Sequence, residues 1–425
     1  MAADKAWYKL DNAAKIYPPA ETSSWMAMFR LSVTLTEEID VPLLRQALGH
    51  ALQRFPTFSC RLRRGLFWYY LEHIDGVPPI TEDVRNPMAP LKLRENGSFL
   101  FRVRCYNKRI ALEFFHVLTD GAGGMTFLLS LVAEYLRLRY GLPVEEGGYI
   151  RSCAGRPDPE EWQDSFLKYA RTETARRAEP PAYQPAGTVV PLQQLLLVSG
   201  TADAERLRAA AAGYGVSVGV LLTAVALQAL LRVQREDGRQ RRRAVKLSVP
   251  VNLRRFYPTR TLRNFSSYVN VGIDGRYGDY TFEEILTQVR GYMMQMMTEK
   301  QLNARFSDNV LMEKKLIVRM LPLFLKDPVL RIAYMVEGDR YMTSTLSNLG
   351  LVELPAVMRP YVDRMAFLLG PPSSRRSVCA CVTYRDKAVI TFSRTITESK
   401  FEQYFFTSLV RMGVPVYIES NGRIE

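Results

Sequence analysis

One histidine in this chain has neighbours suited to acid–base chemistry. The sequence contains only three histidines, and His116 lies in the stretch FHVLTDG, where Asp120 follows it by four residues and Gly121 comes next. A general base that works near neutral pH needs a pKa near neutrality, which favours histidine. The local sequence leaves two interpretations open: a catalytic base, or a structural histidine at the end of a strand.

The other two histidines have less distinctive surroundings. His50 lies beside the apolar face of a predicted helix, where a packed or half-exposed structural histidine is expected, and His73 precedes a turn and is expected to be solvated. His116 instead precedes a glycine-rich loop. We expect Asp120 to order this loop by pairing with a distant arginine, and Gly121 to allow close approach of the backbone to other groups.

Periodic elements of the first half must hold His116 in place. Alternating apolar residues predict a strand over 28–35, and Asp40 precedes a helix whose apolar positions follow the i, i+3, i+4, i+7 pattern. Strands over 99–105 and 109–115 are predicted to form a hairpin, so that His116 ends the second strand. The first half also has a predicted strand over 61–72, a loop opened by Gly121, Gly123 and Gly124, and a helix over 125–140.

A segment punctuated by prolines separates this pattern from a second one. We predict a first subdomain over 1–151, a linker or crossover over 152–190 and a second subdomain over 191–425. Helices of the second subdomain are predicted over 202–214, 217–233, 282–299, 303–337 (broken at Pro322 and Pro328) and 399–412. Its strands are predicted over 245–251, 268–273, 341–347, 365–369, 378–384 and 388–393.

Length and composition predict an ordinary globular protein that is rich in positive charge. A chain of 425 residues suggests two domains of about 200 residues each, and 47% apolar with 24% charged residues is typical of such folds. The net charge is +14, and its densest run consists of Arg239, Arg241, Arg242, Arg243 and Lys246. This run is either a solvated loop or a basic rim that attracts a phosphorylated cofactor. It lacks interleaved aromatic residues, so we expect no nucleic-acid partner.

Several features predict a cytoplasmic protein. The charged start lacks the apolar region of a signal peptide, and the stretch 216–231 is too short and too polar for a membrane span, so we expect it to be a buried helix. Five cysteines, an odd number, indicate free thiols in a reducing compartment. Cys379 and Cys381 have no accompanying ligands, so we expect no metal site and a shared face on one strand.

The residues around His116 resemble a known signature. His116 to Gly121 is similar to the core of the HHxxxDG motif of the chloramphenicol-acetyltransferase-like superfamily, whose second histidine is the base and matches His116. Phe115 replaces the first histidine of the motif. The superfamily includes BAHD acyltransferases, wax ester synthases, alcohol acetyltransferases and the condensation domains of nonribosomal peptide synthesis.

Three further stretches resemble the same superfamily in the same order. Residues 7–18 are similar to the opening of bacterial alcohol-acetyltransferase-like proteins, the relatives that this chain most resembles. Residues 250–254, PVNLR, followed by Asn264, resemble the arginine strand of the family and its downstream asparagine. Residues 347–350, SNLG, resemble the S-N-x-x-G element of wax ester synthases, with the glycine one residue early. The DFGWG motif of the plant enzymes is absent.

The resemblance implies a fold and a reaction. The fold would be α/β of the α+β type: two similar subdomains, each a mixed sheet flanked by helices, with a channel between them. The reaction would be transfer of an acyl group from a thioester, with acyl-CoA as the expected donor substrate and no permanently bound cofactor. The acceptor would be a small alcohol or amine, with O-acylation favoured. His116 would be the general base, and no covalent acyl-enzyme would form.

The resemblance also implies roles for other residues. Asp120 would be a structural brace paired with Arg254 across the two halves, Gly121 would belong to the catalytic loop, and Asn264 would support the site. Ser347 and Asn348 are candidate donors to the oxyanion of the tetrahedral intermediate, and structural roles for both remain open.

Three alternative functions remain open. The first is a condensation-type enzyme that depends on a carrier protein supplied in trans. The second is a non-catalytic relative that binds a lipid or a protein partner, although the intact His116 and Asp120 argue against it. The third is a basic protein that contacts membranes through 316–335, a stretch of apolar and basic residues for which helices lining an apolar channel are the favoured interpretation.

Overall fold

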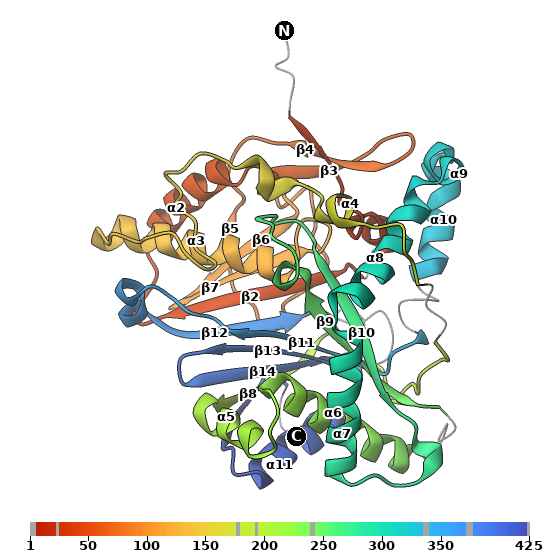
Figure 1. Cartoon of the computed structure of the whole chain (residues 1–425). Coiled ribbons are helices and arrows are strands. Elements are labelled where there is room, and N and C mark those ends of the chain that lie inside the picture. Colours follow the sequence, from red (N-terminus) through yellow and green to blue (C-terminus); the bar gives the residue numbers. More distant parts are fainter. Residues whose placement is uncertain are drawn as a thin grey trace.

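A computed structural model describes residues 6–22, 25–175, 179–191, 194–238, 243–334, 340–370 and 377–422. Figure 1 shows two layered halves, each built on a mixed β-sheet with helices packed against it. The predicted α/β architecture of two sheets flanked by helices is therefore confirmed. A third, small sheet lies at the N-terminal end of the molecule.

The sheet of the first half has five strands. Their order across the sheet is β12 (Val362–Leu369), β2 (Met28–Leu35), β7 (Arg109–Phe115), β6 (Phe101–Tyr106) and β5 (Ile80–Glu82). Helices α2 (Val41–Arg54) and α3 (Gly121–Tyr140) pack against each other, and α3 contacts β2. Aromatic rings fill the core between them, with Phe58 and Phe127 stacked at 4.2 Å between centroids. Asp40 caps α2 as predicted, because its Oδ1 accepts from the Leu43 amide at 3.0 Å.

The sheet of the second half has seven strands. Their order is β10 (Ser266–Ile273), β9 (Val245–Asn252), β11 (Ser344–Leu351), β13 (Ser377–Tyr384), β14 (Lys387–Arg394), β8 (Leu196–Asp203) and β15 (Val416–Ser420). The helices of this half include α5 (Ala204–Gly213), α6 (Val218–Asp237), α7 (Phe282–Met296) and α11 (Lys400–Arg411). Helix α6 is the central one, since it contacts α5, α7, α11, β9 and β11.

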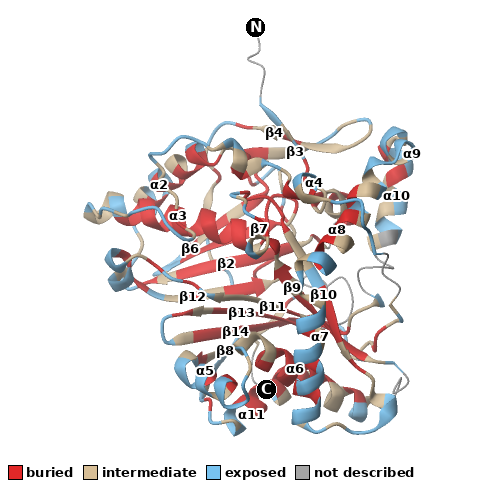
Figure 2. Ribbon diagram, viewed as in Figure 1, coloured by how far each residue is buried: buried red, intermediate tan, exposed pale blue. Residues whose placement is uncertain are grey.

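Helix α6 contains the most apolar stretch of the chain. Among the described residues it is the one helix with the length and hydropathy of a membrane span. Much of α6 is nevertheless buried (Figure 2), and Leu221, Leu222 and Val225 lie fully buried in the core of the second half. The prediction of a buried helix at this position is confirmed.

The second half contributes one strand to the sheet of the first half. β12 belongs to the second half of the sequence, yet it pairs antiparallel with β2, from Val362 opposite Leu35 to Leu369 opposite Phe29. The first-half sheet therefore contains a strand that lies far along the chain. The boundaries at 151 and 190 stay predictions. The sheet of the first half is nevertheless incomplete without residues 362–369 of the second half.

Most of the linker segment has no regular structure. It contains two short helices, η3 (Pro159–Trp162) and α4 (Ser165–Tyr169). It is tied to the second half, because the Leu262 amide donates to the Glu161 carbonyl at 2.7 Å and the Tyr183 amide donates to the Ala244 carbonyl at 2.9 Å.

Several predicted elements need correction. The strand predicted over 61–72 is a hairpin of β3 (Cys60–Arg64) and β4 (Tyr69–His73), which turns where the Gly65 amide donates to the Trp68 carbonyl. These strands form the small sheet with β1 (Trp7–Lys9), which was not predicted. The helical region after residue 298 consists of α8 (Glu299–Lys314), α9 (Leu316–Met320) and α10 (Leu323–Ala333). It breaks near Pro322, whereas Pro328 lies inside α10 rather than ending it.

The glycine-rich stretch after Asp120 is not a loop. Gly121, Gly123 and Gly124 form the first turn of α3, and the Asp120 side chain caps this turn by accepting from the Gly123 amide at 3.0 Å. A Cβ atom on Gly123 would collide with the Leu262 carbonyl oxygen and the Thr119 hydroxyl. Glycine is therefore needed here because the start of α3 lies directly against the second half.

An ion pair joins the halves at the same point. Arg254 lies in the short helix η4 (Leu253–Arg255) after β9, and its Nη1 donates to Asp120 Oδ2 at 2.8 Å. The Phe265 amide donates to the same oxygen at 2.8 Å. Arg254 also donates to the carbonyls of Thr261 at 3.0 Å and Arg263 at 2.6 Å. The pair that the sequence led us to expect is thus present, and it fixes the segment 261–265.

The surroundings of Asp120 keep its carboxylate charged. Burial alone would raise the pKa of Asp120, but the charge and hydrogen bond of Arg254, together with the amides of Gly123 and Phe265, lower this pKa below its ordinary value. A carboxyl group with a lowered pKa adds stability above its unfolded pKa and loses that contribution as the pH falls through the folded value.

Gly123→Ala tests the close contact between α3 and the second half. The added methyl group must displace backbone, so we expect a loss of unfolding free energy of about 1–3 kcal/mol or more, measured by denaturant titration. Gly291→Ala is the matched control, since Gly291 lies on the exposed side of α7 with open space around its Cβ position. This control should be neutral or stabilising by up to about 1 kcal/mol. Equal effects of the two substitutions would contradict the close packing.

A double-mutant cycle of Asp120→Asn and Arg254→Gln tests the ion pair. Asparagine can still accept from the Gly123 amide, so the cycle isolates the charge. Arg254→Gln strands the buried Asp120 carboxylate and should cost about 3–5 kcal/mol, Asp120→Asn leaves the partly exposed Arg254 and should cost less, and the double variant should cost clearly less than the sum. The coupling energy from chemical denaturation should shrink as the pH is lowered, because Asp120 then becomes neutral. Additive effects at neutral pH would show that the pair does not couple the halves.

Candidate active site

His116 stands where β7 ends, as predicted. Its amide donates to the Ala27 carbonyl at 2.8 Å, which holds the residue beside the strand that precedes β2. The imidazole is partly exposed and lies between two rings. Tyr17 stacks on it with centroids 4.8 Å apart, and Phe29 meets it edge-on at 5.2 Å. The ring is therefore fixed by packing on both sides while part of it remains open.

Asn264 connects His116 to the second half. The Asn264 Oδ1 lies 2.9 Å from His116 Nδ1, and its Nδ2 donates to the His116 carbonyl at 3.1 Å. Both the side chain and the backbone of the histidine are thus held by one amide. Asn264 is fully buried in the segment that the Asp120–Arg254 pair fixes.

Asp11 is a site residue to which the sequence analysis gave no role. Its Oδ2 accepts from Asn264 Nδ2 at 3.0 Å, and its Oδ1 accepts from the Ala14 amide at 2.8 Å. The guanidinium of Arg263 lies 3.4 Å from the same carboxylate, and both side chains are buried. The only sequence signal was that Asp11 belongs to the stretch 7–18 noted for its resemblance.

Tyr17 is the second residue without a predicted role. It begins the short helix α1 (Tyr17–Ala20), directly after the helical turn η1 (Ala14–Ile16), whose first amide donates to Asp11. Burial raises the pKa of Tyr17 far above its ordinary value, so its phenol stays neutral. Its position against His116 is a consequence of tertiary packing, which no local pattern could indicate.

The remaining predicted site residues do not bond to His116, and Asn348 Nδ2 lies near Gly219 of α6, 3.9 Å from where a Cβ atom would be. A Cβ atom on Gly121 would lie 3.0 Å from Leu349, so β11 passes close to the start of α3. Asn348 Oδ1 accepts from the Gly350 amide at 2.8 Å, within β11 itself. In the described part of the chain, no hydrogen bond joins Ser347 or Asn348 to His116. Their roles stay predictions.

The other titratable candidates have structural surroundings. His50 Nδ1 lies 2.6 Å from Glu134 Oε1. His73 ends β4 just before the predicted turn and is half-buried rather than fully solvated, with Nε2 3.7 Å from Asp75 Oδ1. Cys379 and Cys381 both point into the core from β13, and burial raises the pKa of Cys381 to about 12. Within the described residues, no three His, Cys, Asp or Glu side chains gather as metal ligands.

The basic run is only partly described. Arg239, Arg241 and Arg242 lie outside the described residues. Lys246 is buried in β9, where its Nζ donates to the Pro180 carbonyl at 2.8 Å and lies 3.4 Å from Glu179. Lys246 is therefore part neither of a solvated loop nor of a basic rim, in contrast to both interpretations of the run.

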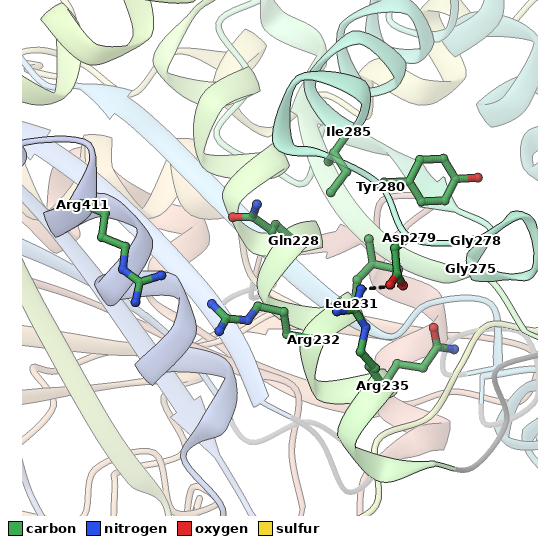
Figure 3. A pocket seen from close by; sticks show the side chains of 11 residues that line it. Gln228, Leu231, Arg232, Arg235, Gly275, Gly278, Asp279, Tyr280, Ile285 and Arg411 are labelled. Atoms are coloured by element: carbon green, nitrogen blue, oxygen red, sulfur yellow. Dashed lines mark ion pairs between the residues drawn. The ribbon is translucent and has the colours of Figure 1, made fainter.

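A hollow of about 510 Å³ lies elsewhere in the second half (Figure 3). It is lined by residues of α6, α7 and α11, and Arg235 at its wall is paired with Asp279 at 2.5 Å. None of the predicted site residues lines it. The candidate active site is therefore the cluster around His116 and not this hollow.

Sequence comparisons give relatives without assigned functions. No protein-family model matches the chain. Two uncharacterized proteins of Mycobacterium tuberculosis, from strains H37Rv and CDC 1551, are each 27% identical to it over 354 residues, which covers 77% of this chain and 79% of each relative.

Solved structures show the fold. Polyketide synthase associated protein 5 from Mycobacterium tuberculosis has a TM-score of 0.63 at 14% identity, covering 94% of this chain and 96% of its own. The trichothecene 15-O-acetyltransferase TRI3 from Fusarium sporotrichioides has a TM-score of 0.60 at 11% identity, covering 96% and 94%. The starter condensation domain of rhizomide synthetase, solved as a mutant with C8-CoA and Leu-SNAC, has 0.60 at 16%, covering 96% and 93%. The chain thus has the two-subdomain fold of condensation domains and chloramphenicol-acetyltransferase-like enzymes.

Proposed function

We propose that this protein is an acyltransferase in which His116 is the general base. The acyl donor is a thioester of the acyl-CoA class, the acceptor is an alcohol or, less favoured, an amine, and no cofactor is permanently bound. The observation that carries the proposal is the hydrogen bond between His116 Nδ1 and Asn264 Oδ1, because it decides which nitrogen can act as the base.

The orientation of the Asn264 amide follows from its neighbours. Its Nδ2 faces the Asp11 carboxylate and the His116 carbonyl, which are both acceptors. Its Oδ1 therefore faces His116 Nδ1 and can only accept a hydrogen bond. The neutral imidazole must carry its proton on Nδ1, and the lone pair is left on Nε2. No described residue hydrogen-bonds to Nε2.

The reaction then follows from the position of this lone pair. Nε2 removes the proton of the acceptor hydroxyl as its oxygen attacks the thioester carbonyl. The tetrahedral intermediate collapses with cleavage of the C–S bond, and the same proton passes from Nε2 to the departing thiolate. The imidazole returns to its neutral form, and no acyl-enzyme is formed. Proton transfer of this kind contributes about 10²- to 10⁴-fold to the rate.

The chain of polar groups behind His116 supports the charged intermediate. When Nε2 is protonated, the imidazolium still donates from Nδ1 to Asn264, and the Asp11 carboxylate lies beyond that amide. For the oxyanion, Ser347 and Asn348 remain the candidate donors. The Oδ1 of Asn348 is held by the Gly350 amide, which leaves its Nδ2 to donate.

A carrier-protein-dependent condensation enzyme is the second candidate. The observation that favours it is the likeness to a starter condensation domain over 96% of this chain. The two candidates differ in the donor and share the base. Parallel assays with acyl-CoA and with an acylated phosphopantetheine carrier would separate them, and we place either activity in the cytoplasm.

The first prediction from the proposed function concerns the tautomer of His116. In protein labelled with ¹⁵N-histidine, we expect neutral His116 to carry its proton on Nδ1, as read from two-bond ¹H–¹⁵N correlations. The three histidines can be assigned from the spectrum of His116→Ala. In Asn264→Ala the acceptor is missing, and the Nε2–H form should become populated. A proton on Nε2 in the unmodified protein would contradict the proposed base.

The second prediction concerns catalysis. His116→Ala should lower the rate of acyl transfer by about 10²- to 10⁴-fold while the protein stays folded at the assay temperature, with some loss of thermal midpoint because the ring packs against Tyr17 and Phe29. His73→Ala is the matched control, because His73 lies on β4 with Asp75 as its nearest charged neighbour, and it should keep full activity. The assay is incubation with an acyl-CoA panel and pooled alcohols and amines, read by mass spectrometry. Activity retained in folded His116→Ala would exclude this residue as the base.

A further inference from the structure

Helices α9 and α10 carry large apolar side chains on the outside of the molecule. The two helices lie at its margin in Figure 1, and Figure 2 shows exposed residues along both. Leu316, Ile317 and Met320 of α9, and Phe324, Val329 and Ile332 of α10, are between 61% and 82% exposed. The channel-lining interpretation of this stretch is therefore wrong for these side chains, although Met335 at its end lies outside the described residues.

The buried side of α10 is unusually polar. Lys326 is buried, donates to the Phe67 carbonyl at 2.8 Å and lies 3.4 Å above the Trp68 ring. Asp327 accepts from the Tyr69 hydroxyl at 2.9 Å. These contacts fix α10 to the β3–β4 hairpin through charged residues and leave Phe324, Val329 and Ile332 facing outward, whereas Leu323 is buried. A surface helix normally has the reverse arrangement, so the exposed apolar side needs a partner.

The charged residues around this apolar face are mostly basic. Between residues 314 and 334 the chain has five basic residues and one acidic residue. The acidic residue is Asp327, which is paired with Arg64 at 3.2 Å. Lys314, Lys315, Arg319 and Arg331 are exposed, and none of them forms an ion pair with a described residue. The face thus combines apolar side chains with unneutralised positive charge.

We infer that α9 and α10 dock the protein onto an anionic lipid surface. Apolar side chains flanked by lysine and arginine are the features by which helices insert at the headgroup boundary, and the positive charge matches anionic headgroups. A second copy of the chain is a poor occupant, because it would bring two basic faces together in molecules that each carry a net charge of +14. The inference does not depend on the proposed acyl transfer.

Flotation of the whole protein with lipid vesicles tests the inference. Vesicles of phosphatidylcholine alone are compared with vesicles that also contain phosphatidylglycerol. We expect the protein to float with the anionic vesicles and much less with the neutral ones, and we expect salt to weaken the binding. The double variant Ile317→Ser/Phe324→Ser should bind anionic vesicles at least about tenfold more weakly, since it removes two insertable side chains.

Matched variants separate the face from the overall charge. Met294→Ser changes a similarly exposed apolar residue on α7, and Arg208→Glu reverses an exposed charge on α5. Met294→Ser should bind as the unmodified protein does, and Arg319→Glu should weaken binding far more than Arg208→Glu. All variants should keep their thermal midpoint, because the altered side chains are exposed.

Four results would overturn the inference. The first is the absence of flotation with anionic vesicles. The second is anionic binding that Ile317→Ser/Phe324→Ser leaves unchanged, which would mean adsorption through net charge alone. The third is a dimer in analytical ultracentrifugation that the same double variant abolishes, which would assign the face to a second copy. Capture of an acidic protein by the face without any lipid binding would likewise reject a lipid surface.

Discussion

The site depends on one buried ion pair between residues that are far apart in sequence. Asp120 ends the segment that carries His116 and caps α3, while Arg254 follows a strand of the other sheet. Arg254 also donates to the carbonyls of Thr261 and Arg263, and the Phe265 amide donates to Asp120. The pair therefore fixes the segment 261–265. Asn264 is therefore brought to the histidine by an interaction in which neither of them takes part.

Residues of both halves contact the His116 ring. The first half supplies the imidazole and packs it against Phe29 and Tyr17, whereas the second half supplies the amide oxygen that contacts Nδ1. Asp11 contacts both sides, since it accepts from the first amide of η1 and from Asn264. A displacement of the halves would change the chemistry of the ring even if every residue of the first half stayed in place.

Local patterns in the sequence predicted the elements that pack through periodic faces, such as β2, β7, α2 and α6. The Asp120–Arg254 pair was predicted from the resemblance to a known superfamily and not from a local pattern. Local patterns failed where tertiary contacts decide the structure. The glycines after Asp120 were expected to form a loop, but a carboxylate cap and a close neighbour make them helical. Asp11 and Tyr17 act through partners more than 95 residues away, so no local pattern could mark them.

The pairing of β12 with β2 constrains the order in which the chain can fold while it is being synthesised. β2 cannot complete its pairing until residues 362–369 have left the ribosome, although the rest of its sheet ends at residue 115. An unpaired sheet edge invites pairing with other chains. The edge of β2 is therefore unpaired during most of translation. In any product truncated before β12, this edge stays unpaired. Such fragments would be expected to need chaperones or to aggregate, whereas in the longer chain β12 covers β2 and itself becomes the edge strand of the sheet.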